Sequence, residues 1–209
     1  MFEKMEFVRP QEIENRSMQL IEEGLEGRTW PEPEFSIVKR CIHTSADFDY
    51  AQNLYFSPGS AQIAVQALQA GASIITDTKM AEAGINKRNL ESLGGCVYCF
   101  MDDPSVAQEA RERGITRSAI CMERGAKVSG KKIFAVGNAP TALIRLYEMI
   151  EEEDFRPDLI IGVPVGFVNV VEAKELIMQT DIPCMVAKGR KGGSTIAAAI
   201  CNALIYFCK

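Results

Sequence analysis

The sequence contains one histidine, His43, and histidine is the side chain that gains and loses a proton near neutral pH. Proton transfer by a positioned side chain is a common way to accelerate a reaction. Arg40 precedes His43 by three residues, so the two side chains share one face if residues 37–45 form a helix. A general acid or base beside a cation is therefore one interpretation of this segment. An ordinary histidine, on the surface or hydrogen-bonded in the core, is the other, and the pattern leaves both open.

Neither a metal centre nor a hydrolase is expected around His43. The chain has no second histidine that could share a metal ion with this one. A Gly-x-Ser-x-Gly element, which carries the nucleophile of many serine hydrolases, is also absent from the sequence. The residues thus favour proton transfer without a bound metal over covalent hydrolysis.

Four further polar residues could contact a ligand, and each has an ordinary structural alternative. Ser17 lies in a predicted helix, where a lone serine is usually exposed or bonded to its own backbone. Arg117 and Ser118 open another predicted helix; an arginine there could hold a carboxylate in a bidentate pair, or could simply be solvated. Thr78 follows a predicted strand, and its alternative role is to cap the next helix.

Residues 188–194 combine Lys188, Arg190 and Lys191 with three glycines and a predicted helix start. Positive charge, flexible backbone donors and a helix N-terminus together suit an anion. A solvated basic turn is the alternative. The loop matches neither the dinucleotide fingerprint nor the P-loop pattern, so a nucleotide site is not predicted from it.

The elements that must position these residues alternate between strand and helix. Five short apolar runs bounded by turn residues have the character of buried parallel strands: 73–76, 96–100, 133–136, 159–163 and 184–187. Segments with helical periodicity lie between them, and Asp103, Asn169 and Ser194 are predicted helix N-caps. Because parallel strands need crossover helices that cover both faces, we expect a three-layer α/β fold with a parallel five-stranded sheet.

The region before the first predicted strand has mostly helical character. Helices are expected at about 11–26, 32–44 and 58–70, and no low-complexity run or internal repeat separates them from the rest. We therefore predict one domain over residues 1–209, with an N-terminal helical arm at about 10–71 and a sheet-containing core at about 72–207.

The seven cysteines lack the paired spacings of a zinc ribbon or a secreted disulfide framework. Reduced thiols are expected. Cys96 and Cys99 form the one CxxC motif, but they fall in a predicted strand, where residues three apart point to opposite faces. Core packing is the preferred interpretation of this pair, over a redox role that would need a helix start.

Charge and hydropathy narrow the class of protein further. The net charge is −5 and the pI about 5.1, which argues against a nucleic-acid-binding protein, because its binding face must be broadly basic. The longest apolar stretch, 196–207, is too short for the ~20 residues that span a bilayer. The N-terminal residues carry acids and no apolar signal region. We expect a cytoplasmic protein that binds neither nucleic acid nor membrane.

Six short motifs stand out along the chain: Arg-Cys-Ile-His at 40–43, Phe-Ser-Pro at 56–58, Thr-Arg-Ser-Ala at 116–119, Gly-Asn-Ala-Pro-Thr-Ala-Leu at 137–143, Gly-Val-Pro-Val-Gly-Phe-Val at 162–168 and Gly-Arg-Lys-Gly-Gly-Ser at 189–194. Taken together, they resemble the precorrin-8X methylmutase family, also called cobalt-precorrin-8 methylmutase. The likeness runs from about residue 11 to 206. It implies a flavodoxin-like α/β fold and a homodimer with active sites near the subunit interface.

The resemblance also implies an activity, an isomerase of cobalamin (vitamin B12) biosynthesis. Such an enzyme moves a methyl group from C-11 to C-12 on ring C of precorrin-8 or cobalt-precorrin-8, giving hydrogenobyrinate or cobyrinate. No cofactor is consumed, and cobalt, where present, belongs to the substrate. The implied partners are the tetrapyrrole, a second copy of the chain and neighbouring pathway enzymes that receive the product.

The family's catalytic histidine corresponds to His43, and its substrate contacts correspond to Ser17 and Arg40, with Arg117 as a further contact. Where close relatives carry threonine after Gly84, this chain has Asn86, which leaves the role of that position open. The full set of predicted substrate-binding residues is Ser17, Arg40, Thr78, Asn86, Arg117, Ser118, Asn138, Lys188, Gly189 and Arg190.

The residues themselves agree with such a substrate. A corrin precursor has several carboxylates around a large apolar ring, so an acidic protein must gather cations locally, from Arg40, Arg117, Lys188, Arg190 and Lys191. Val165, Phe167 and Val168 could form apolar walls. A carrier that binds a tetrapyrrole without converting it is the alternative. A nucleotide- or flavin-binding protein would rest on fold class alone.

Overall fold

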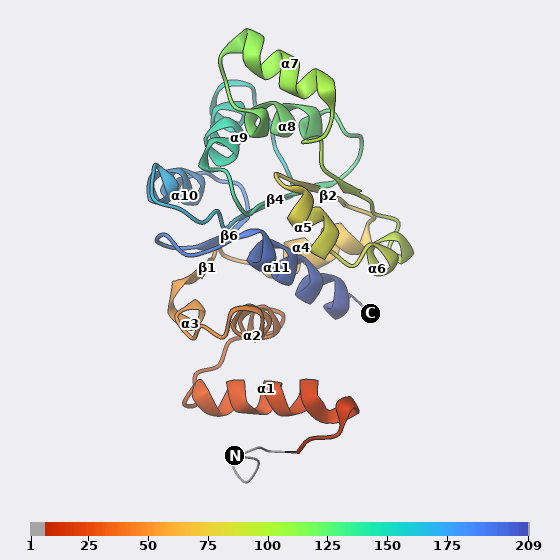
Figure 1. The fold of residues 1–209 in the computed structure, drawn as a ribbon, viewed down its shortest axis with the longest axis vertical. Helices are drawn as coiled ribbons and strands as arrows, with labels where there is room; N and C mark the ends of the chain where they lie inside the picture. The colour runs from red at the N-terminus through yellow and green to blue at the C-terminus, as the bar shows by residue number, and fades with distance from the viewer. Residues whose placement is uncertain (1–6, 209) are drawn as a thin grey trace.

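The computed structural model describes residues 7–208. It contains a mixed six-stranded sheet with helices on both sides (Figure 1). The strands are β1 (Leu54–Phe56), β2 (Ser73–Thr76), β3 (Val97–Tyr98), β4 (Lys132–Val136), β5 (Leu159–Gly162) and β6 (Cys184–Ala187). The helices are η2 (Pro10–Glu12), α1 (Ile13–Gly24), α2 (Glu34–Ser45), α3 (Tyr50–Asn53), α4 (Ser60–Gln69), α5 (Lys79–Gly84), α6 (Lys87–Ser92), α7 (Pro104–Arg113), α8 (Arg117–Ala126), α9 (Pro140–Glu152), α10 (Val170–Gln179) and α11 (Ser194–Phe207).

All five predicted strands are present and parallel to their neighbours, in the order β3-β2-β4-β5-β6. This order is that of flavodoxin-like sheets, and it reverses between β2 and β4. The sequence prediction missed a sixth strand. β1 pairs antiparallel with β6, with Leu54 opposite Ala187, so the sheet is neither five-stranded nor wholly parallel.

Two apolar cores lie on the two faces of the sheet, because successive strand residues point to opposite sides. In β4, Ile133 and Ala135 face one core, while Phe134 and Val136 face the other. The first core is closed by α4 and α11, and the second by α7, α8, α9 and α10. These layers confirm the expected three-layer α/β fold.

Helices α2 and α1 add to these three layers on the side of α11 (Figure 1). α2 packs on α11, and α1 packs on α2 at the end of the molecule farthest from the sheet. α11 therefore has protein on two sides, which explains why its sequence is apolar nearly all round. Ser17 lies on α1, and Arg40 and His43 lie on α2, so these three residues belong to the helices added outside the three layers.

Two local predictions need correction. Ser194 is the first residue of α11 and Gly193 holds the N-cap position, so the N-cap prediction for Ser194 was wrong. Asn169 holds the N-cap position of α10 as predicted, although its side chain makes no capping hydrogen bond. Cys96 precedes β3 and is exposed, so core packing was the wrong interpretation for that thiol. Asp103 caps α7 as predicted, with its carboxylate accepting from the Ser105 N–H at 2.9 Å. All seven cysteines are free.

Candidate active site

The point where the strand order reverses is filled by a buried carboxylate. Asp77 follows β2 directly and is 1% exposed. Its two oxygens accept hydrogen bonds from the backbone N–H groups of Gly137, Asn138 and Ala139, at 2.9, 2.8 and 2.7 Å. Burial raises the pKa of Asp77, and the three backbone donors act in the opposite direction. The carboxylate thus fixes the loop that follows β4.

This arrangement bears on the nucleotide-binding alternative. In flavodoxin-like sheets, the ligand phosphate is received by backbone N–H groups at the carboxyl ends of the strands near this reversal. Here those N–H groups, just before α9 (Pro140–Glu152), already have an internal anion, Asp77. The fold-based expectation of a nucleotide or flavin therefore has no support at this position.

Thr78 connects the same region to the start of α11. Its hydroxyl accepts from the Ala81 N–H and caps α5, and it lies 2.7 Å from the Ser194 hydroxyl. Gly137 fits closely beside Ser194, because a Cβ at Gly137 would lie only 2.6 Å from the Ser194 Cα. Thr78 is half-buried, and the neighbouring Asn138 is exposed. Of the predicted residues, these two border the reversal point.

The loop after β6, residues 188–193, carries the predicted cations on the surface. Lys188 lies over the Tyr55 ring at 4.9 Å, and Arg190 lies over the Phe167 ring at 5.7 Å from the centroid. Phe167 is 84% exposed, so an apolar surface and a cation stand side by side. Gly189, between them, adopts a positive φ of 76° that favours glycine.

The same loop is tied to the end of α2. The Lys191 ammonium bonds the carboxylates of Asp47 and Asp49, the latter at 2.6 Å. These aspartates follow His43 by four and six residues. His43 lies in the last turn of α2 and is exposed, so its imidazole is open to a ligand. Of the cations expected to meet the substrate, Lys191 is thus paired with carboxylates of the chain itself.

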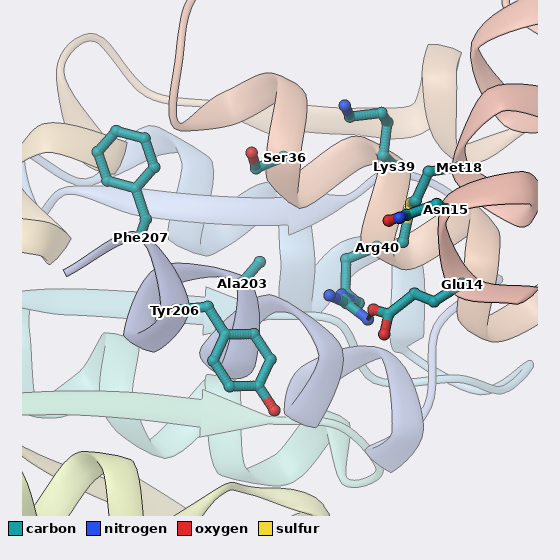
Figure 2. A pocket seen from close by; sticks show the side chains of 9 residues that line it. All are labelled: Glu14, Asn15, Met18, Ser36, Lys39, Arg40, Ala203, Tyr206 and Phe207. Atoms are coloured by element: carbon teal, nitrogen blue, oxygen red, sulfur yellow. Dashed lines mark hydrogen bonds and ion pairs between the residues drawn. The ribbon is translucent and has the colours of Figure 1, made fainter. Parts of the chain in front are cut away.

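Arg40 lies one turn before His43 at the edge of a pocket of about 340 Å³ between α1, α2 and α11 (Figure 2). Its guanidinium pairs with the Glu14 carboxylate at 3.0 Å and lies 5.6 Å from the centroid of the Tyr206 ring. Figure 2 shows Arg40 directed toward Glu14, with Tyr206 below it on α11. The shared helix face predicted for Arg40 and His43 is consistent with α2.

Ser17 and Asn86 do not line this pocket, but each lies close, in the chain or through a hydrogen bond, to a residue that does. Ser17, one turn after Glu14 on α1, donates its hydroxyl proton to the Ile13 carbonyl at 2.8 Å, which is the backbone-bonded state typical of a helical serine. Asn86 caps α6, and its amide donates to the Tyr206 hydroxyl at 3.3 Å. Asn86 and Arg40 therefore share Tyr206 as a neighbour.

Arg117 and Ser118 lie apart from the arm, at the start of α8. Arg117 is exposed, whereas Ser118 is buried and its hydroxyl lies 3.0 Å from those of both Thr116 and Thr141. The Ser118 hydroxyl thus joins the first turns of α8 and α9, and the residue is 6% exposed. The exposed Arg117 remains a candidate to bind a substrate carboxylate.

Three of the predicted cations have no carboxylate partner within residues 7–208: Arg117, Lys188 and Arg190. Surface cations without a carboxylate partner of their own suit a ligand with several carboxylates. Across the described part of the chain, no group of three His, Cys, Asp or Glu side chains could hold a metal ion. Within the same residues, no helix is long and apolar enough to cross a membrane.

Sequence reasoning did not single out two buried charges that shape this region, Asp77 and Lys174. Lys174 is 1% exposed, and its ammonium donates to the carbonyls of Gly189 and Lys191. A lone lysine on the apolar face of a predicted helix is the signal that could have found it. For Asp77, the signal is an acid placed directly after a buried strand, at a sheet edge where ligands bind.

Comparison with known proteins relates the chain to one family. A family model described as precorrin-8X methylmutase matches residues 12–207. The chain is 43% identical over 204 residues to the cobalt-precorrin-8 methylmutase of Salmonella typhimurium, covering 94% of this chain and 95% of that protein. It is 39% identical over 197 residues to that of Priestia megaterium, covering 94% and 88%.

A solved structure shares the fold. The crystal structure of precorrin-8X methylmutase from Thermus thermophilus has a TM-score of 0.86 and 35% sequence identity to this chain, covering 94% of this chain and 97% of that one.

Proposed function

The chain belongs to the precorrin-8X methylmutase family, isomerases of cobalamin biosynthesis, and from that premise we propose that it moves a methyl group from C-11 to C-12 on ring C of precorrin-8 or cobalt-precorrin-8. The product is hydrogenobyrinate or cobyrinate. The reaction is intramolecular, so the enzyme has to bind the ring, orient it and move protons. It needs no methyl donor and no cofactor, and cobalt, where present, enters as part of the substrate.

The observation that carries this proposal is the position of His43. It is the chain's single histidine, exposed in the last turn of α2, with Arg40 one turn before it. Lys191 ties the residues that follow His43 to the loop that presents Lys188 and Arg190. The segment that follows His43 is thus linked to the loop that carries two of the predicted substrate cations.

His43 acts as the general acid and base. It donates a proton to an atom of ring C or its neighbourhood, which makes C-12 electron-poor and draws the methyl group with its bonding electrons from C-11. The imidazole then accepts a proton as the conjugated product forms. General acid–base catalysis of this kind is typically worth ~10²–10⁴-fold in rate.

The cations bind the carboxylate arms of the substrate. Arg40, Arg117, Lys188 and Arg190 are the contributors, and Phe167 with its exposed ring offers an apolar wall beside Arg190. Charge-assisted bonds to carboxylates are stronger than neutral ones and fix the orientation of a large ring. Lys188 and Arg190 stand beside the exposed carboxyl-end loops, and Arg40 stands on the arm.

A second copy of the chain completes the site. Ile13 and Leu20, seven residues apart on one face of α1, are 54% and 47% exposed. A single chain leaves this apolar face and His43 uncovered, and proton transfer is more effective in a site from which water is excluded. We expect light scattering coupled to gel filtration to give the mass of a homodimer, and a monomer at micromolar concentration would contradict this part of the proposal.

The test is a spectroscopic time course with purified protein and each substrate, precorrin-8 and cobalt-precorrin-8. Relatives at 39% and 43% identity are named for the cobalt-containing substrate, so cobalt-precorrin-8 is expected to convert faster. The His43→Ala variant should bind the substrate with nearly normal affinity and convert it ~10²–10⁴-fold more slowly. The control is Thr44→Ala, which alters the next exposed residue of α2 and should leave turnover unchanged.

Two results would contradict the assignment. Normal turnover in His43→Ala would remove the histidine from the mechanism. Tight binding of both substrates without any spectral conversion by the unmodified chain would favour a tetrapyrrole carrier.

A further inference from the structure

A buried ammonium lies beneath the basic loop. Lys174, in α10 (Val170–Gln179), is 1% exposed and packs in a helix whose neighbouring buried positions include Val170, Ala173 and Ile177. Burial lowers the pKa of Lys174 to about 8. A charge is expensive to bury, and methionine, of similar length and apolar, would fill the same space without that cost. The position of its ammonium therefore calls for a specific partner.

The partners are two alternate carbonyls of one loop. The Lys174 ammonium donates to the Gly189 carbonyl at 2.7 Å and to the Lys191 carbonyl at 2.9 Å. The intervening carbonyl, that of Arg190, accepts from the Gly166 N–H at 3.2 Å. Three successive carbonyls are thus held from two sides, by α10 and by the loop after β5. Hydrogen bonds from a charged donor are stronger than neutral ones.

This clamp holds the residues on which the site depends. Arg190 stands between the two clamped carbonyls, with its guanidinium over the Phe167 ring. Lys191 carries one clamped carbonyl, and its side chain bonds Asp47 and Asp49, just after His43. A displacement of this loop would therefore move a substrate-binding cation and loosen the end of the helix that carries the histidine.

We propose that Lys174 is a positioning residue: its ammonium holds the 188–193 loop in the conformation that binds the substrate carboxylates, without touching the substrate itself. The proposal rests on the proposed function for its effect on turnover. Its effect on the loop does not depend on that function, because the hydrogen bonds concerned are present in the chain alone.

The test compares Lys174→Met with Lys132→Met in the full-length protein. Lys132 also donates its ammonium to a backbone carbonyl, that of Gly130 at 2.7 Å, but it lies at the start of β4, at the opposite end of that strand from Asp77. The two variants therefore remove the same kind of bond from the two ends of the sheet. Hydrogen exchange of backbone amides and steady-state kinetics with cobalt-precorrin-8 are measured for both.

For Lys174→Met, amide exchange should accelerate at least tenfold at Gly166 and Gly193, whose N–H groups bond Arg190 and Val163. Exchange at Gly137, held by Asp77, should stay unchanged. If the loop then occupies its binding conformation about a tenth of the time, KM rises about tenfold while kcat stays within about threefold. Lys132→Met should change none of these quantities.

Each other outcome has a defined meaning. Unchanged exchange at Gly166 and Gly193 in Lys174→Met would overturn the proposal, as would an equal acceleration at Gly137, which would indicate general destabilisation. Faster loop exchange with an unchanged KM would also overturn it. If the unmodified chain converts neither substrate while Lys174→Met still frees the loop, the loop-holding role stands and the proposed function fails.

Discussion

The substitution Asp77→Ala should have the largest effect on stability of any single change considered for this protein. It removes the carboxylate that accepts three backbone N–H bonds at 2.7 to 2.9 Å, in a position that is 1% exposed. The three donors belong to Gly137, Asn138 and Ala139, which lead into α9. In the variant they lose their partner, while Gly137 remains closely packed against the start of α11.

The magnitude follows from the cost of unsatisfied buried groups. Each buried donor left without a partner costs about 1–3 kcal/mol. Three donors give a gross cost of at most about 9 kcal/mol, and less than that because only the Gly137 bond is buried while those of Asn138 and Ala139 are partly buried. Part is regained, because the folded state no longer has to bury the carboxylate, the cause that raises its pKa. We expect a net loss of about 4 kcal/mol in the free energy of unfolding, in the range for breaking a buried charged contact.

The assay is urea unfolding followed by far-ultraviolet circular dichroism at neutral pH. At about 2–4 °C per kcal/mol for a chain of this size, the same loss lowers Tm by about 8–16 °C. Asp77→Asn keeps one acceptor oxygen and should lose about half as much. The control is Asp103→Ala, because that carboxylate also caps a helix but accepts from a single backbone N–H, at 2.9 Å, near the surface.

The reasoning would be refuted if Asp77→Ala lost less than about 1.5 kcal/mol or no more than Asp103→Ala. Such a result would mean that water or a backbone shift satisfies the three donors. The loop after β4 would then be held by packing and not by the carboxylate.

Three further predictions concern affinity, pH and the α8–α9 contact. Arg40→Ala should raise the Kd for the substrate about 10–100-fold at low salt, since charge-assisted bonds contribute about 1.5–3 kcal/mol. Lys174 has a folded-state pKa of about 8 against 10.5 unfolded, so the folded state binds fewer protons between these values and its stability rises with pH. The unfolding free energy of the unmodified chain minus that of Lys174→Met should therefore increase by roughly 2 kcal/mol from pH 8 to 10.5, after allowance for solvent screening. Ser118→Ala should lose about 1–2 kcal/mol in urea unfolding, because Thr116 and Thr141 lose a buried hydroxyl partner.

These three predictions have clear contrary results. Unchanged affinity in Arg40→Ala, measured beside the exposed Arg111→Ala as control, would remove Arg40 from the binding surface. A difference that stays flat between pH 8 and 10.5 would show that Lys174 is not held at a lowered pKa by burial. Unchanged stability in Ser118→Ala, with a weaker substrate affinity, would move Ser118 from a structural to a binding role.

The sequence by itself determined the class of fold and the family. Apolar runs of four to five residues between helical segments located all five parallel strands, since burial on both faces leaves a continuous apolar signal. The cap at Asp103 was predictable because it depends on residues two positions apart. The short motifs around His43 and in the loops after β4, β5 and β6 sufficed to indicate the family.

Only the tertiary structure decided how the candidate site is held together. β1 has three residues, too few for a periodic signal, and it forms because β6 offers an open edge. Lys191 meets Asp47 and Asp49 across more than 140 residues, and Asn86 meets Tyr206 across 120. Asp77 and Lys174 are ordinary charged residues in the sequence. Each of them holds a loop in place, because folding brings backbone N–H or carbonyl groups around the charge. No local sequence pattern specifies these groups.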